Sequence, residues 1–192
     1  MGTPSAIDVR ARGPRLYHVQ QDHPLAIALL AELAIDYSTR YGDTAGAIHH
    51  RLRDCPAADF ADPLGDLVVL VEHGEPVAGG GFRRRDPTTA ELERVWTARE
   101  QRRRGLATRV LAELEAGMIR LGYRQACAAI GDRQPEARRL YTTAGYTEVR
   151  SGPQRRDRPF RFEKVLGADP LVRGGTPEGA AIPIPGRVRR RV

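Results

Sequence analysis

A short turn between a strand-like segment and an amphipathic helix carries the most recognisable chemistry of this chain. Residues 91–101, ELERVWTAREQ, are strand-like and run directly into Arg102-Arg103-Arg104-Gly105-Leu106-Ala107. The first amides of a helix have no intrahelical acceptor, and the helix dipole favours negative charge beside them. We therefore expect this turn to bind an anion, with pyrophosphate as the ligand.

The helix after the turn is well marked. Its apolar residues recur every three to four positions, at Leu106, Val110, Leu111, Leu114 and Met118. Small residues at Gly105 and Ala107 allow a ligand to come close, and three arginines offer donors to phosphate oxygens. A solvated basic loop is the alternative, because charge runs usually face water. The sequence contains no GxxxxGK[ST] motif and no GxGxxG motif after a strand, which argues against a P-loop or a Rossmann phosphate site.

The turn and its surroundings resemble the GNAT superfamily of N-acetyltransferases. Arg102-x-x-Gly105-x-Ala107 is similar to the acetyl-CoA signature Q/R-x-x-G-x-G/A of that family. Upstream, AELERVWTARE resembles the family's fourth strand. Downstream, GDRQPEARRLYTTAGYTEV resembles the exit from the fifth strand, the fourth helix and the sixth strand. The resemblance covers residues 16–166.

This resemblance implies an α/β (α+β) fold with a mixed, mostly antiparallel twisted sheet of about seven strands, flanked by helices and splayed at the cofactor site. We expect a flexible lead at 1–15, one N-acetyltransferase domain at 16–167 and a Pro/Gly/Arg-rich tail at 168–192. The tail holds four prolines and four glycines in 25 residues and is expected to be disordered. A docking arm for a partner or second subunit is the alternative.

Local patterns place the individual elements. Strands are expected at 16–19, 67–72, 76–83, 89–97, 125–130, 146–150 and 160–166. Helices are expected from Pro24 to Gly42, at 44–52, from 106 to Gly122, and at 135–144, with Asp22 or His23 capping the first.

The family resemblance assigns the cofactor site residue by residue. The main chain of Val95, Trp96 and Thr97 would pair with the pantetheine arm as if it were another strand. The pyrophosphate would lie on Arg102, Arg103, Arg104, Gly105, Leu106, Ala107 and Thr108. Gln134 stands where the family usually has asparagine, and its longer amide can still contact CoA.

Two residues are the catalytic candidates. Tyr141 ends a segment similar to the family pattern N-x-x-A-x-x-L-Y, which implies a general acid for the thiolate; a buried core tyrosine is the alternative. Glu91 is the candidate base, directly or through water. Strict alternation would place Glu91, Glu93 and Val95 on one strand face and Leu92, Arg94 and Trp96 on the other, unless a bulge intervenes.

The acceptor site is the least specified part of the sequence. The first helices are expected to contribute Tyr37, Arg40 and Tyr41, together with His49 and His50, and residues 151–158 would form the opposite wall. Arginines there could bind an acidic group on a small amine, or could be solvated. The absence of an acidic groove weighs against strongly cationic acceptors.

Composition excludes several other functions. The net charge is +7, but Lys164 is the single lysine among 31 basic residues, aromatic residues make up 6%, and no nucleic-acid-binding motif is present. The longest aliphatic run is 67–71 and the first residues lack a signal-peptide core, so no membrane segment is expected. Cys55 and Cys127 are expected to be reduced thiols of a cytoplasmic protein without a metal site.

These observations predict an acetyl-CoA-dependent N-acetyltransferase that releases CoA. The acetyl group would move to a primary amine of a small molecule by direct attack in a ternary complex. A non-catalytic acyl-CoA-binding or regulatory module and acetylation of a protein amine remain the alternatives, and a homodimer is left open.

Overall fold

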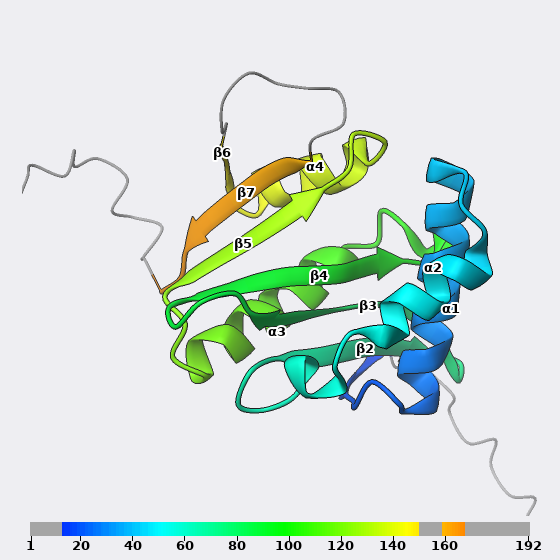
Figure 1. The fold of residues 1–192 in the computed structure, drawn as a ribbon, viewed down its shortest axis with the longest axis horizontal. Helices are drawn as coiled ribbons and strands as arrows, with labels where there is room; N and C mark the ends of the chain where they lie inside the picture. The colour runs from blue at the N-terminus through cyan, green and yellow to red at the C-terminus, as the bar shows by residue number, and fades with distance from the viewer. Residues whose placement is uncertain (1–12, 150–158, 168–192) are drawn as a thin grey trace, which may run out of the picture.

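The protein is built on one mixed sheet, seen in a computed structural model that describes residues 13–149 and 159–167 (Figure 1). Its strand order is β1-β2-β3-β4-β5-β7-β6. The strands are β1 Arg15–His18, β2 Asp66–Glu72, β3 Glu75–Arg84, β4 Thr89–Thr97, β5 Gln125–Ile130, β6 Thr147–Val149 and β7 Phe160–Val165. Neighbouring strands pair antiparallel except β4 and β5, which are parallel. The expected seven-stranded, mostly antiparallel sheet is confirmed.

Three of the four helices expected from the sequence begin at the expected residue, and the second begins one residue later than expected, with Thr44 as its N-cap. They are α1 Pro24–Tyr41, α2 Ala45–Asp54, α3 Leu106–Arg120 and α4 Pro135–Thr143. The His23 side chain accepts a hydrogen bond from the Leu25 amide at the start of α1, and Gly42 ends that helix with a φ of 82°. Two short 3-10 turns, at Ala57–Phe60 and Arg99–Gln101, were not expected from the sequence.

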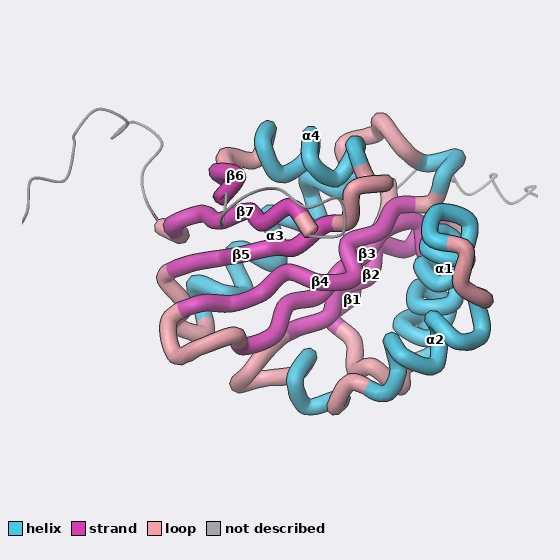
Figure 2. The backbone as a smooth tube through the Cα atoms, turned by 45° about the horizontal axis from the view of Figure 1, so that its top comes forward, coloured by secondary structure: helices cyan, strands magenta, loops and turns pink. Residues whose placement is uncertain are grey.

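Helices cover the two faces of the sheet at close range. Side chains of successive residues in a strand point to opposite faces. A Cβ atom at Gly79 would collide with Leu29 of α1, whereas one at Gly80 would lie 3.3 Å from Leu114 of α3. Thus α1 and α3 pack on opposite sides of β3, and Figure 2 shows α1 and α2 side by side at one edge of the molecule.

The sheet opens between β4 and β5. Their parallel register runs from Thr89 opposite Gln125 to Leu92 opposite Ala128. Beyond Leu92, the rest of β4 is paired in the described sheet with β3 alone, and Figure 1 shows β4 and β5 diverging in this direction. The splay implied by the family resemblance is therefore present, and it leaves one edge of β4 open over residues 93–97.

A β-bulge in β4 lies at the point of divergence. Gly79 pairs with Trp96 and Gly81 with Glu93, so two residues of β4, Arg94 and Val95, lie opposite Gly80. Arg94 has a φ of 61°, a left-handed conformation that is uncommon for a residue with a side chain.

The bulge breaks the expected alternation of side chains. Leu92 and Val95 both pack in the core on the α3 side, while Trp96 packs with the leucines of α1 on the other side. Strict alternation therefore does not hold along β4, because the bulge adds a residue and reverses the sides after Glu93.

Three segments for which the sequence made predictions lie outside the described residues. They are residues 1–12 of the lead expected at 1–15, the second acceptor wall at 151–158 and the tail at 168–192. The expectations for these segments remain predictions.

Candidate active site

A cavity of about 620 Å³ opens where β4 leaves β5. Its walls come from the free part of β4, the arginine turn, the first turn of α3, the end of β5, α4 and the inner side of α1. Segments far apart in sequence meet here because the splayed strands leave a gap that the helices border. A cavity of this size is typical of a small-molecule or cofactor site.

The arginine turn and the start of α3 form the anion end of the cavity. Gly105 is the N-cap of α3, with a φ of 76° and, within the described chain, no side chain capping the helix. The first turn of α3 contains no acidic residue, and Leu106, Ala107 and Thr108 line the cavity. Their amides are therefore available to an anion, and a Cβ atom at Gly105 would meet nothing within 4 Å, so the approach is open.

The three consecutive arginines of the turn point in different directions. Arg102 and Arg103 line the cavity. Arg104 is not among its lining residues and binds Glu72 of β2 instead, with distances of 2.7 and 2.9 Å from its two terminal nitrogens to the carboxylate oxygens. Arg104 holds the pKa of Glu72 below its usual value. The expected cofactor set is therefore gathered in one place except for Arg104.

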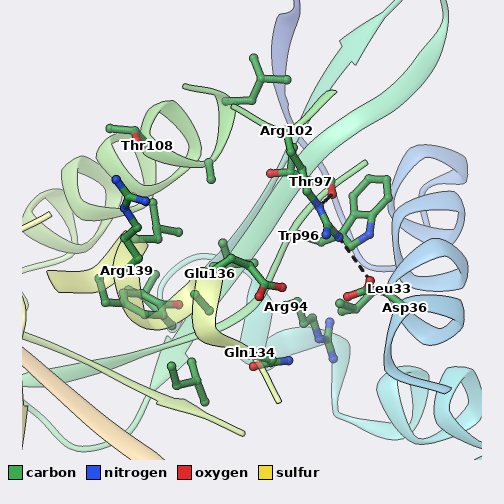
Figure 3. A pocket seen from close by; sticks show the side chains of 18 of the residues that line it. Leu33, Asp36, Arg94, Trp96, Thr97, Arg102, Thr108, Gln134, Glu136 and Arg139 are labelled. Atoms are coloured by element: carbon green, nitrogen blue, oxygen red, sulfur yellow. Dashed lines mark hydrogen bonds and ion pairs between the residues drawn. The ribbon is translucent and has the colours of Figure 1, made fainter. Parts of the chain in front are cut away.

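Other arginines enter the cavity from positions that the sequence analysis did not select. Arg99 lies in the 3-10 turn after β4, and Arg139 of α4 also lines the cavity (Figure 3). Arg139 follows Glu136 by three residues on one helix, so both can border the same space. The three-residue spacing of Glu136 and Arg139 in the sequence could have predicted that both lie on one side of this helix.

The free edge of β4 forms the floor of the cavity. Val95, Trp96 and Thr97 all line it, as expected. The Trp96 side chain is 7% exposed and packs against Leu29, Leu30 and Leu33, so its ring is a core group. The Thr97 hydroxyl is buried, and in the described part of the chain it has no hydrogen-bond partner.

Tyr141 of α4 lies at the wall of the cavity and also in the core. It is 4% exposed, its ring stacks on Phe162 at 5.6 Å, and its edge meets Tyr146 at 5.3 Å between centroids. Burial raises the pKa of its hydroxyl well above the ordinary value, and the nearby Tyr37 adds to this effect. The group is therefore protonated at neutral pH, as an ordinary tyrosine also is, and the raised pKa makes it a weaker acid.

Only part of the expected acceptor wall borders the cavity. Tyr37 and Arg40 of α1 line it, together with Gln134 at the start of α4. Burial raises the pKa of the Tyr37 hydroxyl, and a hydrogen bond with Gln134 partly opposes this shift.

The other expected residues of this wall lie elsewhere. Tyr41 is not among the lining residues and stands against Gly131 in the loop after β5. His49 and His50 are on α2, where His50 pairs with Asp54 at 2.6 Å, and neither borders the cavity.

The two carboxylates of β4 differ in position. Glu93 lines the cavity, and its Oε1 accepts a 2.7 Å hydrogen bond from the Nε of Arg83. Glu91 does not line the cavity, and its Oε2 lies 3.9 Å from Nη2 of the same arginine. Both carboxylates precede the bulge and face Arg83, so alternation places them on one side of the strand. Glu93 borders the opening because it lies beyond Leu92, where the pairing of β4 with β5 ends.

A chain of ion pairs crosses the cavity from the arginine turn to α4. Asp36 of α1 pairs with Arg102 at 3.2 Å and with Arg40 at 2.9 Å. Arg40 in turn pairs with Glu136 of α4 at 2.5 Å. Its guanidinium therefore already faces two carboxylates, which leaves it poorly placed to bind an acidic group of an acceptor. Asp36 and Glu136 were not selected from the sequence.

The described part of the chain offers neither a metal site nor a membrane-spanning helix. Among residues 13–149 and 159–167, no three His, Cys, Asp or Glu side chains are close enough together to hold a metal ion. None of the helices in the described ranges combines the length and apolar character that crossing a bilayer requires.

Comparison with known proteins places this arrangement in a family. Residues 27–146 match the model of the acetyltransferase (GNAT) family. That segment contains β2 to β5, the arginine turn and all of α3 and α4. Curated protein sequences gave no significant match to the chain.

Several solved structures share the fold. An acetyltransferase from Streptococcus agalactiae is 13% identical, with a TM-score of 0.63 over 81% of this chain and 100% of the other. An aminoglycoside 6′-N-acetyltransferase complexed with coenzyme A is 17% identical, with a TM-score of 0.62 over 81% and 99%. A GNAT acetyltransferase from Elizabethkingia anophelis with acetyl-CoA bound is 12% identical, with a TM-score of 0.59 over 81% and 100%.

Proposed function

The chain belongs to the acetyltransferase (GNAT) family and is an acyltransferase, and on this premise we propose that it moves an acetyl group from acetyl-CoA to a primary amine of a small molecule. Two of the structures that share its fold contain coenzyme A or acetyl-CoA. The remaining support comes from the chain's own cavity.

One observation carries the proposal: a single cavity joins the open edge of β4 to the uncapped start of α3. A strand edge offers amide hydrogen bonds to an extended amide-containing arm, as in β-strand addition. A helix N-terminus offers amides and a favourable dipole to phosphates. A molecule with a pyrophosphate at one end and a pantetheine arm at the other matches both features.

The residues present fit this cofactor. Arg102, Arg103 and the amides of 106–108 would hold the pyrophosphate, and residues 95–97 would hold the arm. The buried Thr97 hydroxyl, which has no hydrogen-bond partner among the described residues, adds a polar group that a ligand amide could satisfy. Acetyl-CoA supplies an activated acyl group as a thioester, which an unprotonated amine attacks directly.

Tyr141 is the proposed general acid. Like any tyrosine it carries its proton at neutral pH, so its Oη can donate a hydrogen bond to a leaving thiolate. Burial raises its pKa, which makes the hydroxyl a weaker acid than an exposed tyrosine. Packing against Phe162 and Tyr146 fixes the ring, which limits the positions of the hydroxyl. Tyr141 can therefore pack in the core and also act as a donor at the cavity, which it lines.

The base is proposed to be a carboxylate of β4 acting through water. Glu91 was the candidate from the sequence, but Glu93 is the carboxylate that borders the cavity. Arg83 holds Glu93 in place through a short hydrogen bond. We therefore assign proton removal from the amine first to Glu93. Glu91, two residues earlier in β4, does not border the cavity.

The test is a screen of amines with acetyl-CoA, in which a thiol reagent detects released CoA. Amino acids, polyamines, aminoglycosides and short peptides with free N-termini would serve as acceptors, each compared with a reaction that lacks the enzyme. Acetyl transfer to a small amine supports the proposal. CoA binding without turnover on any acceptor supports a non-catalytic acyl-CoA-binding module, and turnover confined to peptides supports a protein acetyltransferase.

A further inference from the structure

Arg102 makes two contacts inside the cavity, and both are at the long end of hydrogen-bond distances. Its Nε donates to the Thr97 carbonyl at 3.3 Å, and its Nη2 donates to Oδ1 of Asp36 at 3.2 Å (Figure 3). Charge-assisted hydrogen bonds of this kind are usually 2.7–2.9 Å long. About a third of the Arg102 side chain is exposed, and so is about a quarter of the Asp36 side chain. The guanidinium is thus held loosely.

Asp36 does not depend on Arg102 for charge compensation. Arg40 binds both oxygens of this carboxylate, with Nε at 2.9 Å from Oδ2 and Nη2 at 3.3 Å from Oδ1. If Arg102 left, Asp36 would keep its ion pair on α1. Breaking an ion pair is costly when it leaves a buried charge without a partner. The departure of Arg102 would not do so, because Asp36 would still be paired with Arg40.

We propose that Asp36 limits the affinity of the enzyme for CoA by competing with the pyrophosphate for Arg102. This inference rests on the proposed function, which places the pyrophosphate at the arginine turn. A pyrophosphate offers several charged oxygens to a guanidinium, whereas Asp36 offers one oxygen that it already shares with Arg40. Arg102 therefore moves from Asp36 to the cofactor, and the ion pair between α1 and the turn is broken when CoA binds.

The exchange makes Asp36 an affinity-determining residue that touches neither the thioester nor the proton-transfer groups. Part of the binding energy of Arg102 is used to break its contact with Asp36. Because partly exposed ion pairs are weak, the expected penalty is about two- to fivefold in the dissociation constant.

The experiment measures the dissociation constant of CoA by calorimetry for a double-mutant cycle of Asp36→Asn and Arg102→Gln. Asp36→Asn should bind CoA about two to five times more tightly than the unmodified protein. Arg102→Gln should bind more weakly, and adding Asp36→Asn to Arg102→Gln should give no further gain. Asp43→Asn is the matched control, because it removes the same charge from a carboxylate that pairs with Arg51 outside the cavity.

The possible results separate the inference from the proposed function. Unchanged or weaker CoA binding by Asp36→Asn, with normal binding by the unmodified protein, overturns the competition but leaves the acetyltransferase assignment intact. A gain that persists fully with Gln at position 102 also overturns it, since a general charge effect would then suffice. Absence of CoA binding by the unmodified protein overturns both. Asp36→Ser replaces Asp36→Asn if the latter does not fold.

Discussion

The guanidinium carbon of Arg94 lies 3.6 Å from the centre of the Phe60 ring, and this contact anchors the bulge of β4. Arg94 is 4% exposed and also donates to the Gln21 side chain at 2.7 Å and to the Leu52 carbonyl at 2.6 Å, near the end of α2. Burial lowers its pKa, but a guanidinium remains charged at neutral pH. The residue thus joins the splayed strand to the segment before α1, to α2 and to the 3-10 turn at Ala57–Phe60.

The Arg94 contact gives a prediction about stability. Arg94→Ala and Arg94→Gly both remove the side chain and leave Gln21 and Leu52 without their donor, which should cost about 2–4 kcal/mol of unfolding free energy. Glycine tolerates the φ of 61°, so Arg94→Gly should be about 1 kcal/mol more stable than Arg94→Ala. Urea denaturation of both variants measures the difference. Equal stabilities would show that the bulge relaxes when the arginine is removed.

Removing the hydroxyl of Tyr141 tests its role as an acid. Tyr141→Phe keeps the ring contacts with Phe162 and Tyr146 and should cost little stability, but it should lower turnover by roughly ten- to ten-thousandfold. The dissociation constant of acetyl-CoA should hardly change. Tyr146→Phe is the matched control, since that tyrosine packs beside Tyr141 and is not among the lining residues. Full turnover by Tyr141→Phe with a good acceptor would reject the assignment.

The same tyrosine gives a prediction about alkaline pH. Its pKa is raised in the folded protein above the value of about 10 for an exposed tyrosine, so its stabilising contribution is complete below about pH 10 and is lost as pH rises further. Unfolding free energy from urea titrations should therefore fall as pH rises above about 10, and Tyr141→Phe should make the fall shallower. An identical slope in the variant would indicate that Tyr141 ionises equally easily in both states.

A charged side chain at Gly105 tests the anion end of the cavity. Gly105→Glu places a carboxylate beside the uncapped amides of α3 and should weaken acetyl-CoA binding severely. Gly105→Gln is the matched control, because it has the same size and the same backbone strain at a φ of 76° but no charge. Calorimetry should show a much larger loss for Glu than for Gln. If Gly105→Glu bound acetyl-CoA with unchanged affinity, the pyrophosphate could not bind at this turn.

The two glutamates of β4 can be separated by parallel substitutions. Glu93→Gln should lower turnover by about tenfold or more, because Glu93 borders the cavity. Glu91→Gln should have the smaller effect, since Glu91 lies outside the lining. Steady-state rates over a pH series compare the two variants. A larger loss in Glu91→Gln would restore the assignment made from the sequence.

Local signals in the sequence determined most of the fold. The apolar spacing of α3, the cap at His23 and the stop at Gly42 act over a few residues, so their positions could be predicted closely. The arginine turn and Tyr141 were also found in sequence, through patterns that are contiguous along the chain. The structure brings them to one cavity, although their roles remain predictions.

Only the tertiary structure decided which side chains face the cavity. Alternation along β4 fails because the backbone adds one residue at Arg94, and that residue is held by Gln21, 73 positions away. Arg104 lies outside the expected site because it binds Glu72 of β2. Asp36 belongs to the site because it pairs with Arg102, which lies 66 positions later in the sequence. Such contacts depend on how distant segments pack, and neither periodicity nor local capping carries that information.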